Sequence, residues 1–415
     1  MTYSTPKSKL KSYAVLGSAL LLSGVATAAA EESPEPKSAL QEAIDSSKPI
    51  FNARIRYETV SQDGIALDAD AVTYRLRAGF QTGSLWDTTA LIEFDHIRDL
   101  EDDFNSTING RTQFPVVADP NATELNRIQL VNKSLPDTTI TLGRQRIKLD
   151  NDRFVGNVGW RQNEQTFDAV RVVNTSVDGL KLDVTYIDQV NRIFGDDSPM
   201  GRWDSESFLI NANYKLPIDG VKANVTGFIY LLDFDSAPGA SSQTFGVNAA
   251  ASTSGFTLKG TYAAQSDYGA QPTDYSADYY TVEGSYANSG FVGKVGYEVL
   301  TGDGTIGFST PLATLHAFNG WADVFLATPA TGIEDLYGDI SYTKKSLGPL
   351  DLLKVGVVYH SYSSESTSAD YGSEVGVVGV AKMKKFTVLT KYTNYDSDGF
   401  ATDRSKFWLQ LDFAL

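Results

Sequence analysis

Arginines stand out among the residues of this chain that could do chemistry, because they alternate with apolar residues. Arg54 and Arg56 do so within one short run, and Arg75 and Arg77 do so within the next. Such alternation is typical of a β-strand with two different faces. Rings of charge set the ion preference of pores. The first chemistry to consider is therefore the selection of anions by a basic wall.

The stretch 138–173 holds the strongest conflict between charge and register. Ile140 and Leu142 alternate with threonines, and the same register continued would put Arg144 on the apolar face, at a cost of several kcal/mol. Gly143 is the natural place for a β-bulge, which would exchange the two faces. We therefore predict a bulge that turns some residues inward, namely Arg144, Arg146 and Lys148, and others outward, namely Gln145, Ile147 and Leu149.

Ten residues form the predicted solute path along the inner wall. They are Arg54, Arg56, Arg75, Arg77, Arg127, Arg144, Arg146, Arg171, Lys181 and Asp168. Asp168 and Arg171 share a side only if the strand from Phe167 to Val173 also slips by one residue. In the alternative interpretation these cations only pair with inward acids such as Glu58, Glu93 and Asp183, and they keep a polar wall hydrated.

The elements that must position these residues follow one pattern from Phe51 onward. About ten alternating residues, a tight turn, about ten more alternating residues and a longer polar loop recur along the chain, which gives eighteen strands, with sixteen as the alternative. Short connections such as 134–137 and 177–179 alternate with long ones such as 98–121, 148–164 and 301–333. Short turns on one rim and long loops on the other predict an all-β fold, a transmembrane antiparallel β-barrel.

Soluble β-sandwiches and tandem β-domains are the alternatives to this barrel. They expose polar residues on one face, whereas here one face of nearly every strand carries Leu, Val, Ile, Tyr or Phe and the other carries charge. The chain ends with alternating apolar residues from Phe407 to Leu415, like the terminal strand that assembly machinery recognises. We expect that machinery, membrane lipid and lipopolysaccharide as partners.

The N-terminal segment predicts export. Three lysines at 7, 9 and 11 precede the apolar run from Tyr13 to Val25, and small residues follow, so 1–30 is predicted as a signal peptide, with an uncleaved anchor as the alternative. Residues 31–50 would be a short periplasmic segment, and 51–415 the barrel. The predicted location is the outer membrane of a Gram-negative bacterium.

Composition excludes several functions. The net charge is −16, and removal of the three lysines makes it −19, which argues against nucleic acid as a partner. The chain has no cysteine, so it has neither disulfides nor Cys-type zinc sites. After residue 30 no apolar run has the length of a membrane-spanning helix.

No catalytic or metal site is predicted, and the chain is not expected to be an enzyme or to need a cofactor. The three histidines, His96, His316 and His360, lack a paired nucleophile motif, and His316 is expected to pack or hydrogen bond within its loop. Acidic clusters at 99–103, 150–152 and 196–197 are interpreted as solvated loops. Calcium bound to these loops is the alternative, although no EF-hand spacing is present.

Three stretches resemble the alginate-export porin family. They are Ser38 to Asp63, Gly143 to Val172 with GRQRIKLDNDRFVGNVGWRQNEQTFDAVRV, and Asp303 to Tyr337 with TPLATLHAFNGWADVFLATPATGIEDLY. The resemblance implies a monomeric eighteen-stranded barrel whose basic lumen passes anionic material. We therefore predict an anion-selective channel for diffusion or export of anionic solutes or acidic saccharides. A closed structural or adhesive barrel is the alternative, favoured if 301–333 plugs the pore.

Overall fold

The computed structural model describes residues 37–415, so the predicted signal peptide and residues 31–36 lie outside it. Eighteen strands and one short α-helix make up the regular structure of this part. Their bounds are α1 Ala39–Asp45, β1 Lys48–Gln62, β2 Ala69–Gln81, β3 Thr88–Asp103, β4 Ala122–Asn132, β5 Thr138–Gln145, β6 Thr166–Asn174, β7 Leu180–Asn191, β8 Arg202–Ile218, β9 Val221–Leu232, β10 Ser242–Thr253, β11 Phe256–Ser266, β12 Ser276–Asn288, β13 Phe291–Leu300, β14 Ile333–Leu347, β15 Leu350–Ser363, β16 Asp370–Met383, β17 Phe386–Asp396 and β18 Arg404–Ala414. Two 3₁₀ turns, η1 Pro238–Ala240 and η2 Leu315–Ala317, lie in the loops.

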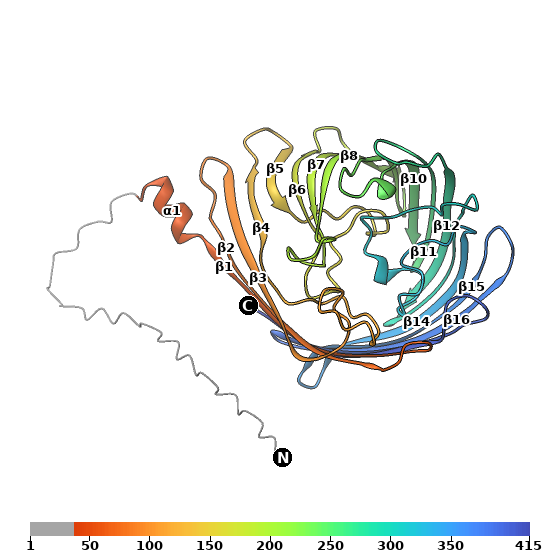
Figure 1. Ribbon diagram of the computed structural model, residues 1–415. Coiled ribbons are helices and arrows are strands. Elements are labelled where there is room, and N and C mark those ends of the chain that lie inside the picture. Colours follow the sequence, from red (N-terminus) through yellow and green to blue (C-terminus); the bar gives the residue numbers. More distant parts are fainter. Residues whose placement is uncertain (1–36) are drawn as a thin grey trace, which may run out of the picture. The chain divides into compact units, whose positions relative to one another are not determined.

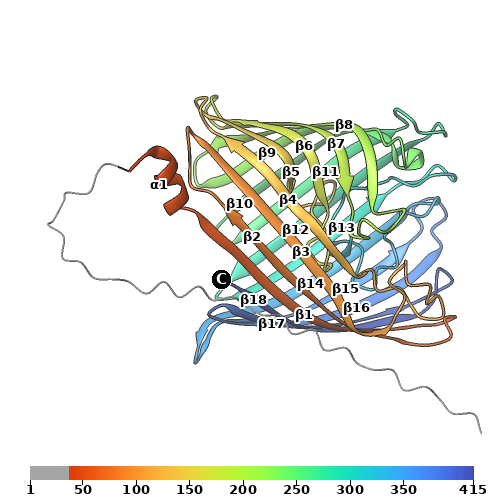
Figure 2. The same ribbon diagram turned by 60° about the vertical axis from the view of Figure 1, so that its left-hand side comes forward.

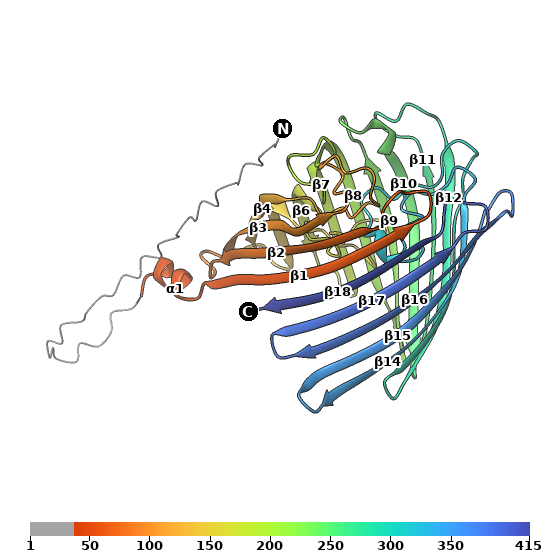
Figure 3. The ribbon, with the colours of Figure 1, turned by 60° about the horizontal axis from the view of Figure 1, so that its bottom comes forward.

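All eighteen strands belong to one antiparallel sheet in which each strand pairs with its neighbours in sequence. β1 also pairs with β18, from Asn52 with Ala414 to Gln62 with Arg404, which closes the sheet into a barrel. Figure 3 shows these two strands side by side, and Figure 2 shows the strands tilted across the wall. Closure leaves no unpaired edge. The predicted fold class is confirmed, with eighteen strands rather than sixteen.

The two faces of the wall are inverted relative to a soluble barrel. On the outer face, Leu258, Val295 and Ile340 are 60%, 62% and 67% exposed. On the inner face, Arg56 and Glu93 are buried. Apolar groups in contact with the surroundings and charged groups inside suit a wall surrounded by lipid. The predicted outer-membrane location agrees with this fold.

The connections alternate in length, as predicted. The short rim carries 82–87, 133–137, 175–179, 219–220, 254–255, 289–290, 348–349 and 384–385. The opposite rim carries the longer loops, including 104–121, 146–165 and 301–332. Because the strand number is even, β1 begins and β18 ends at the short-turn rim.

Helix α1 precedes the barrel and packs against the β2–β3 turn. The amide of Gly83 donates to the carbonyl of Ala43 at 2.9 Å. A Cβ at Gly83 would lie 2.7 Å from the backbone carbonyl oxygen of Ala43, so a larger residue would push the helix away from the turn. β1 then starts at Lys48, slightly before the predicted barrel boundary at 51. Within 37–415, no helix has the length and apolar character needed to cross a membrane.

The predicted bulge at Gly143 is wrong. β5 pairs with β4 and with β6 without a register shift, although Gly143 has a positive φ of 106°. Arg144 is therefore in register with Ile128 and Asp168, on the face of the exposed Leu142, and not on the lumen face. The charge is tolerated there because β5 ends at the next residue and Asp168 lies 2.7 Å away.

The residues after β5 also differ from the prediction. Ile147 and Leu149 are buried inside the barrel with Phe167, rather than facing outward. Arg146, which follows the end of the strand, does point inward, whereas Lys148 is exposed and pairs with Asp152 at 2.8 Å. β5 ends at Gln145, so the alternation of inward and outward side chains does not continue beyond that residue.

Candidate functional site

Two long loops enter the barrel, and together with the inner wall they form the candidate site. Loop A is 146–165, between β5 and β6, and loop B is 301–332, between β13 and β14. Figure 1 shows both inside the ring of strands. Their apolar residues pack against those of the strands in the buried core within the barrel, among them Val155 of loop A and Phe308, Leu312 and Phe325 of loop B. The two loops narrow the lumen.

Backbone hydrogen bonds join the two loops. The amide of Gly156 donates to the carbonyl of Leu312 at 2.9 Å, and the amide of Thr314 donates to the carbonyl of Asp152 at 3.0 Å. The Gln165 side chain also donates to the Leu312 carbonyl at 3.1 Å. Loops A and B therefore form one constriction rather than two independent flaps.

Arginines of β1 and β2 hold the backbone of loop A. Arg54 donates to the carbonyls of 159, 160 and 161 at 3.2 to 3.3 Å. Arg56 donates to the Trp160 carbonyl at 2.5 Å, and Arg75 to the Gln162 carbonyl at 3.2 Å. Arg56 and Arg75 are 1% and 4% exposed. These two guanidinium groups thus satisfy loop carbonyls and are not open to a solute.

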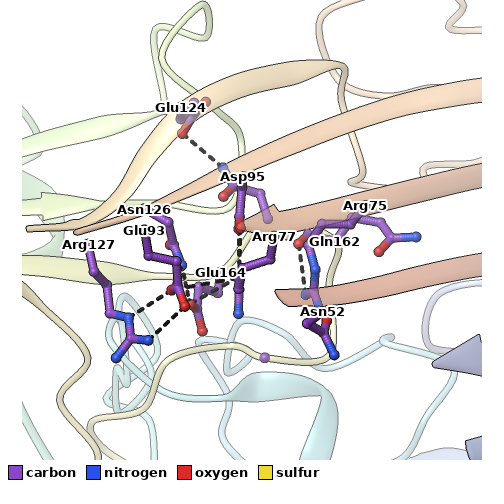
Figure 4. Close-up of polar contacts among 12 residues, drawn as sticks. Asn52, Arg75, Arg77, Glu93, Asp95, Glu124, Asn126, Arg127, Gln162 and Glu164 are labelled. Atoms are coloured by element: carbon purple, nitrogen blue, oxygen red, sulfur yellow. Dashed lines mark hydrogen bonds and ion pairs between the residues drawn. The ribbon is translucent and has the colours of Figure 1, made fainter. Parts of the chain in front are cut away.

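Carboxylates neutralise the next arginines along the wall, as Figure 4 shows. Arg127 makes two bonds of 2.8 Å to Glu93, and Arg77 makes two bonds of 2.6 and 2.5 Å to Asp95. Such paired contacts are the strongest geometry for an arginine and a carboxylate. Arg146 reaches Glu93 at 3.1 Å and also contacts Glu164.

Glu164 ties loop A to this network. It lies 3.1 Å from Arg77 and accepts bonds of 2.6 Å from the amides of Asn126 and Asn157. Burial by itself raises the pKa of this carboxyl, but Arg77 and Arg146 outweigh burial and lower the pKa to about 2. Glu164 is therefore charged at any physiological pH.

We call this side of the lumen the arginine wall. It contains seven arginines, Arg54, Arg56, Arg75, Arg77, Arg127, Arg146 and Arg161, and six carboxylates, Glu58, Glu93, Asp95, Asp119, Glu164 and Asp412. The wall is close to neutral. The side chains of Arg54, Arg127 and Arg146 are 13%, 15% and 26% exposed, so they present most of its positive charge to the lumen.

The ten predicted path residues separate into three groups. Six of them meet in the arginine wall: Arg54, Arg56, Arg75, Arg77, Arg127 and Arg146. Arg171 faces inward and pairs with Asp183 at 2.5 Å, and the exposed Lys181 lies on the same face nearer the short-turn rim. Arg144 and Asp168 pair with each other away from the wall, which corrects their predicted place in the path.

The opposite side of the lumen, which we call the cavity wall, surrounds a cavity of about 420 Å³. Carboxylates and lysines of β11 to β14 line it: Lys259, Glu283, Lys294, Glu298, Asp335 and Asp339. Asn319 and Trp321 of loop B also line it. Glu283 pairs with Lys259 at 2.9 Å, and Glu298 accepts a bond of 2.7 Å from Arg153 of loop A. This wall therefore offers both signs of charge around open space.

Sequence reasoning missed the cavity wall as a site. Its carboxylates alternate with apolar residues in the same way as the arginines do, for example Glu298 between Tyr297 and Val299. That signal was available, but alternation shows only that a residue faces inward. Which inward residues border a cavity depends on where loop B lies.

Acidic loops were the candidates for a cation. Within residues 37–415, only Glu101, Asp102 and Asp103 gather closely enough to share one ion. All three are exposed, and Arg111 pairs with Asp102 at 2.6 Å and with Asp103 at 2.8 Å. An arginine thus occupies the position that a cation would need.

Comparison with known proteins supports the fold. The sequence matches no family model and no curated protein. The structure is similar to the outer membrane protein OpdK of Pseudomonas aeruginosa, with a TM-score of 0.69 and 15% identity over 90% of this chain and 99% of that one. It is also similar to OccK9 (OpdG) of the same organism, with a TM-score of 0.68 and 15% identity over 90% and 100%.

A structure of Pseudomonas aeruginosa OpdK with vanillate is similar as well. Its TM-score is 0.67 at 12% identity, over 90% of this chain and 99% of that one. The chain therefore has the architecture of outer-membrane porins.

Proposed function

We propose that this protein is an outer-membrane channel that lets small solutes with an anionic group diffuse through a narrow, charged constriction. One observation carries the proposal: a closed barrel is narrowed by two loops, and beside the apolar cluster that these loops join, its inner walls carry ion-paired charges that border open space. Charged walls keep a lumen hydrated, and hydrated narrow lumens conduct selectively.

The preference for anions rests on the accessible guanidinium edges of Arg54, Arg127 and Arg146. Each is already paired with a carboxylate of the protein, so a passing anion would share an existing donor rather than meet an isolated charge. Vanillate, which occurs with the similar OpdK structure, is itself a small carboxylate. Both points favour a weakly bound organic anion as the solute.

The size of the solute follows from the cavity. About 420 Å³ is near the lower end of pockets that hold small ligands, about 300 to 1,000 Å³. A small anion suits this space better than an extended polymer does. The family resemblance implies export of alginate or another acidic saccharide, and this is the alternative substrate for the same channel.

Uptake of matched solutes into proteoliposomes tests the proposal. Benzoate, benzamide and benzylamine have similar size but carry a negative charge, no charge and a positive charge. Benzoate should enter fastest. In planar bilayers with a salt gradient, the sign of the reversal potential should show that anions permeate better than cations. Firm preference for benzylamine would contradict the anionic solute. A purified, folded barrel without any conductance would contradict the channel itself.

A closed structural or adhesive barrel is the second candidate, because loop B does fold into the lumen and Phe308, Leu312 and Ala322 in it are fully buried. If this candidate is correct, conductance will appear only after deletion of 305–328. In either case the barrel would be monomeric, surrounded by lipid and lipopolysaccharide, and inserted by assembly machinery through β18.

A further inference from the structure

A buried lysine on the barrel wall lies where loops A and B meet β17 and β18. Lys391 projects inward from β17 and is only 6% exposed. Its ammonium lies 3.8 Å from the ring centre of Trp321 in loop B and 4.5 Å from that of Trp160 in loop A. The ring of Trp408, on β18, is 5.4 Å away. We call this group of three indoles the tryptophan box.

His316 of loop B contacts both Lys391 and the tryptophan box. Lys391 donates to Nε2 of His316 at 2.8 Å, and Nδ1 of His316 lies 2.7 Å from Asp323. These contacts fit a neutral imidazole whose Nδ1 carries the proton and whose Nε2 accepts from the ammonium. The indole of Trp160 stacks on this imidazole at 4.4 Å with an angle of 9°. The hydrogen bonding and packing predicted for His316 are therefore confirmed.

Asp323 connects the box to both sides of the constriction. It lies 2.6 Å from Lys406 of β18 and 3.3 Å from Arg161 of loop A. Arg161 in turn pairs with Glu58 of β1 at 3.0 Å. One lysine thus contacts a ring from each loop and, through His316, the carboxylate that both loops and the wall share.

We propose that Lys391 is the positioning residue that keeps loops A and B docked, and so sets the width of the pore. A cation between aromatic faces in a desolvated site is a strong contact, and here its rings come from three separate elements. The Lys391 ammonium occupies the space between the three indoles. The tryptophan box therefore holds the two loops together, an arrangement that we call the clasp, and it is not a binding site for solutes. The effect on conduction rests on the proposed channel function, whereas the docking itself does not.

The decisive variant is Lys391→Met, which keeps the stem of the side chain and removes the ammonium. His316 Nε2 then loses its donor and the indoles lose their cation. We expect amide hydrogen exchange in 153–163 and 314–325 to become about tenfold faster, equal to about 1.4 kcal/mol of docking free energy. In planar bilayers, the open channel should become wider and noisier.

Three comparisons make the test specific. Lys391→Arg restores a cation and should recover part of the protection and of the conductance. Lys354→Met makes the same substitution at an exposed, inward lysine of β15 and should change neither. Because three of the five tryptophans of the chain form the box, iodide should quench the fluorescence of Lys391→Met more strongly than that of the native protein.

The outcomes separate the two proposals. Unchanged exchange in Lys391→Met, or equal changes in Lys391→Met and Lys354→Met, would overturn the clasp even if the protein conducts. Faster exchange confined to the loops, in a protein that never conducts, would support the clasp and refute the channel.

Discussion

The arginine wall and the cavity wall differ in how their charges are used. On the arginine wall, Arg56, Glu58 and Glu93 are each 1% exposed. Arg56 donates to the backbone of loop A, Glu58 accepts from Arg161, and Glu93 accepts from Arg127. On the cavity wall, Lys259 and Lys294 are 53% and 33% exposed and border open space. The arginine wall thus has more charged residues than the cavity wall, but fewer of them are accessible to a solute.

This difference teaches that residue type and accessibility are separate properties. The arginines were the obvious candidates for solute contact, yet most of their donors hold loop A or pair with carboxylates. Buried ion pairs contribute little net stability, but breaking one leaves an uncompensated charge. Variants of the buried members of the arginine wall should therefore act mainly on folding, whereas variants of the accessible groups on either wall should act mainly on conduction.

The largest effect is expected from Glu93→Gln. Glu93 is buried and is the carboxylate that pairs with Arg127, at 2.8 Å, so its neutralisation leaves this guanidinium, whose side chain is 15% exposed, without its ion pair. The free energy of unfolding should fall by about 3 to 5 kcal/mol. Glu283→Gln, which frees the exposed Lys259 on the cavity wall, should cost less than about 1 kcal/mol. Unfolding in urea, followed by gel mobility of unheated samples, measures both, and equal losses would contradict the comparison.

A fall in pH should weaken the contacts of the tryptophan box before it weakens those of the arginine wall. Burial, followed by repulsion from Lys391 and Arg161, lowers the pKa of His316 to about 3, although Asp323 opposes this. Because the undocked imidazole binds a proton near its ordinary pKa of 6.5, docking is most stable above pH 6.5. It should weaken by about 1.4 kcal/mol per pH unit below that value, or about 2.7 kcal/mol at pH 4.5.

Glu164 on the arginine wall loses its contribution to stability in a lower pH window. Its lowered pKa of about 2 gives a contribution that is complete above the ordinary value of 4.5 and is lost only as the pH falls from there. Between pH 6.5 and 4.5, hydrogen exchange should therefore increase around 314–325 while 163–165 stays protected. His316→Gln, which can still donate to Asp323 and accept from Lys391, should abolish this pH dependence. Simultaneous loosening of both regions would contradict the separation.

A smaller effect is expected from Arg146→Gln, which removes the most exposed guanidinium of the arginine wall. The ratio of anion to cation permeability should fall by about two- to threefold, the effect of a partly screened charge worth about 0.5 kcal/mol. The matched control is Arg144→Gln, two residues away but off the lumen face. Reversal potentials in a salt gradient distinguish them, and equal shifts would return Arg144 to the solute path.

The smallest effect is expected from Asp339→Asn on the cavity wall. Asp339 lines the cavity and has no ion pair among residues 37–415. Its neutralisation should raise anion preference by less than about twofold, because water in the cavity screens the charge. Asp178→Asn, in the exposed turn 175–179, is the control and should leave the reversal potential unchanged. A fall in anion preference would show that Asp339 does not face the conducting path.

Much of the fold could be predicted from the sequence. Leu409, Leu411 and Phe413 at period 2 and the alternating loop lengths identified eighteen strands, because a wall between lipid and water imposes both patterns on any chain that forms it. The inward direction of Arg54, Arg56, Arg75 and Arg77 followed from the same alternation. Gly143 was misassigned, because the end of a strand relieves a misplaced charge as well as a bulge does.

The sequence by itself determined the barrel, the order of its strands and the face on which most charges lie, since these depend on the repeating pattern of neighbouring residues. Only the tertiary structure decided which charges remain available. Glu93 and Arg146 are 53 positions apart, and Trp160 and Lys391 are much further apart along the chain. Pairing, burial and the position of two loops inside a closed barrel are properties of distances in space, and no local pattern of residue types encodes them.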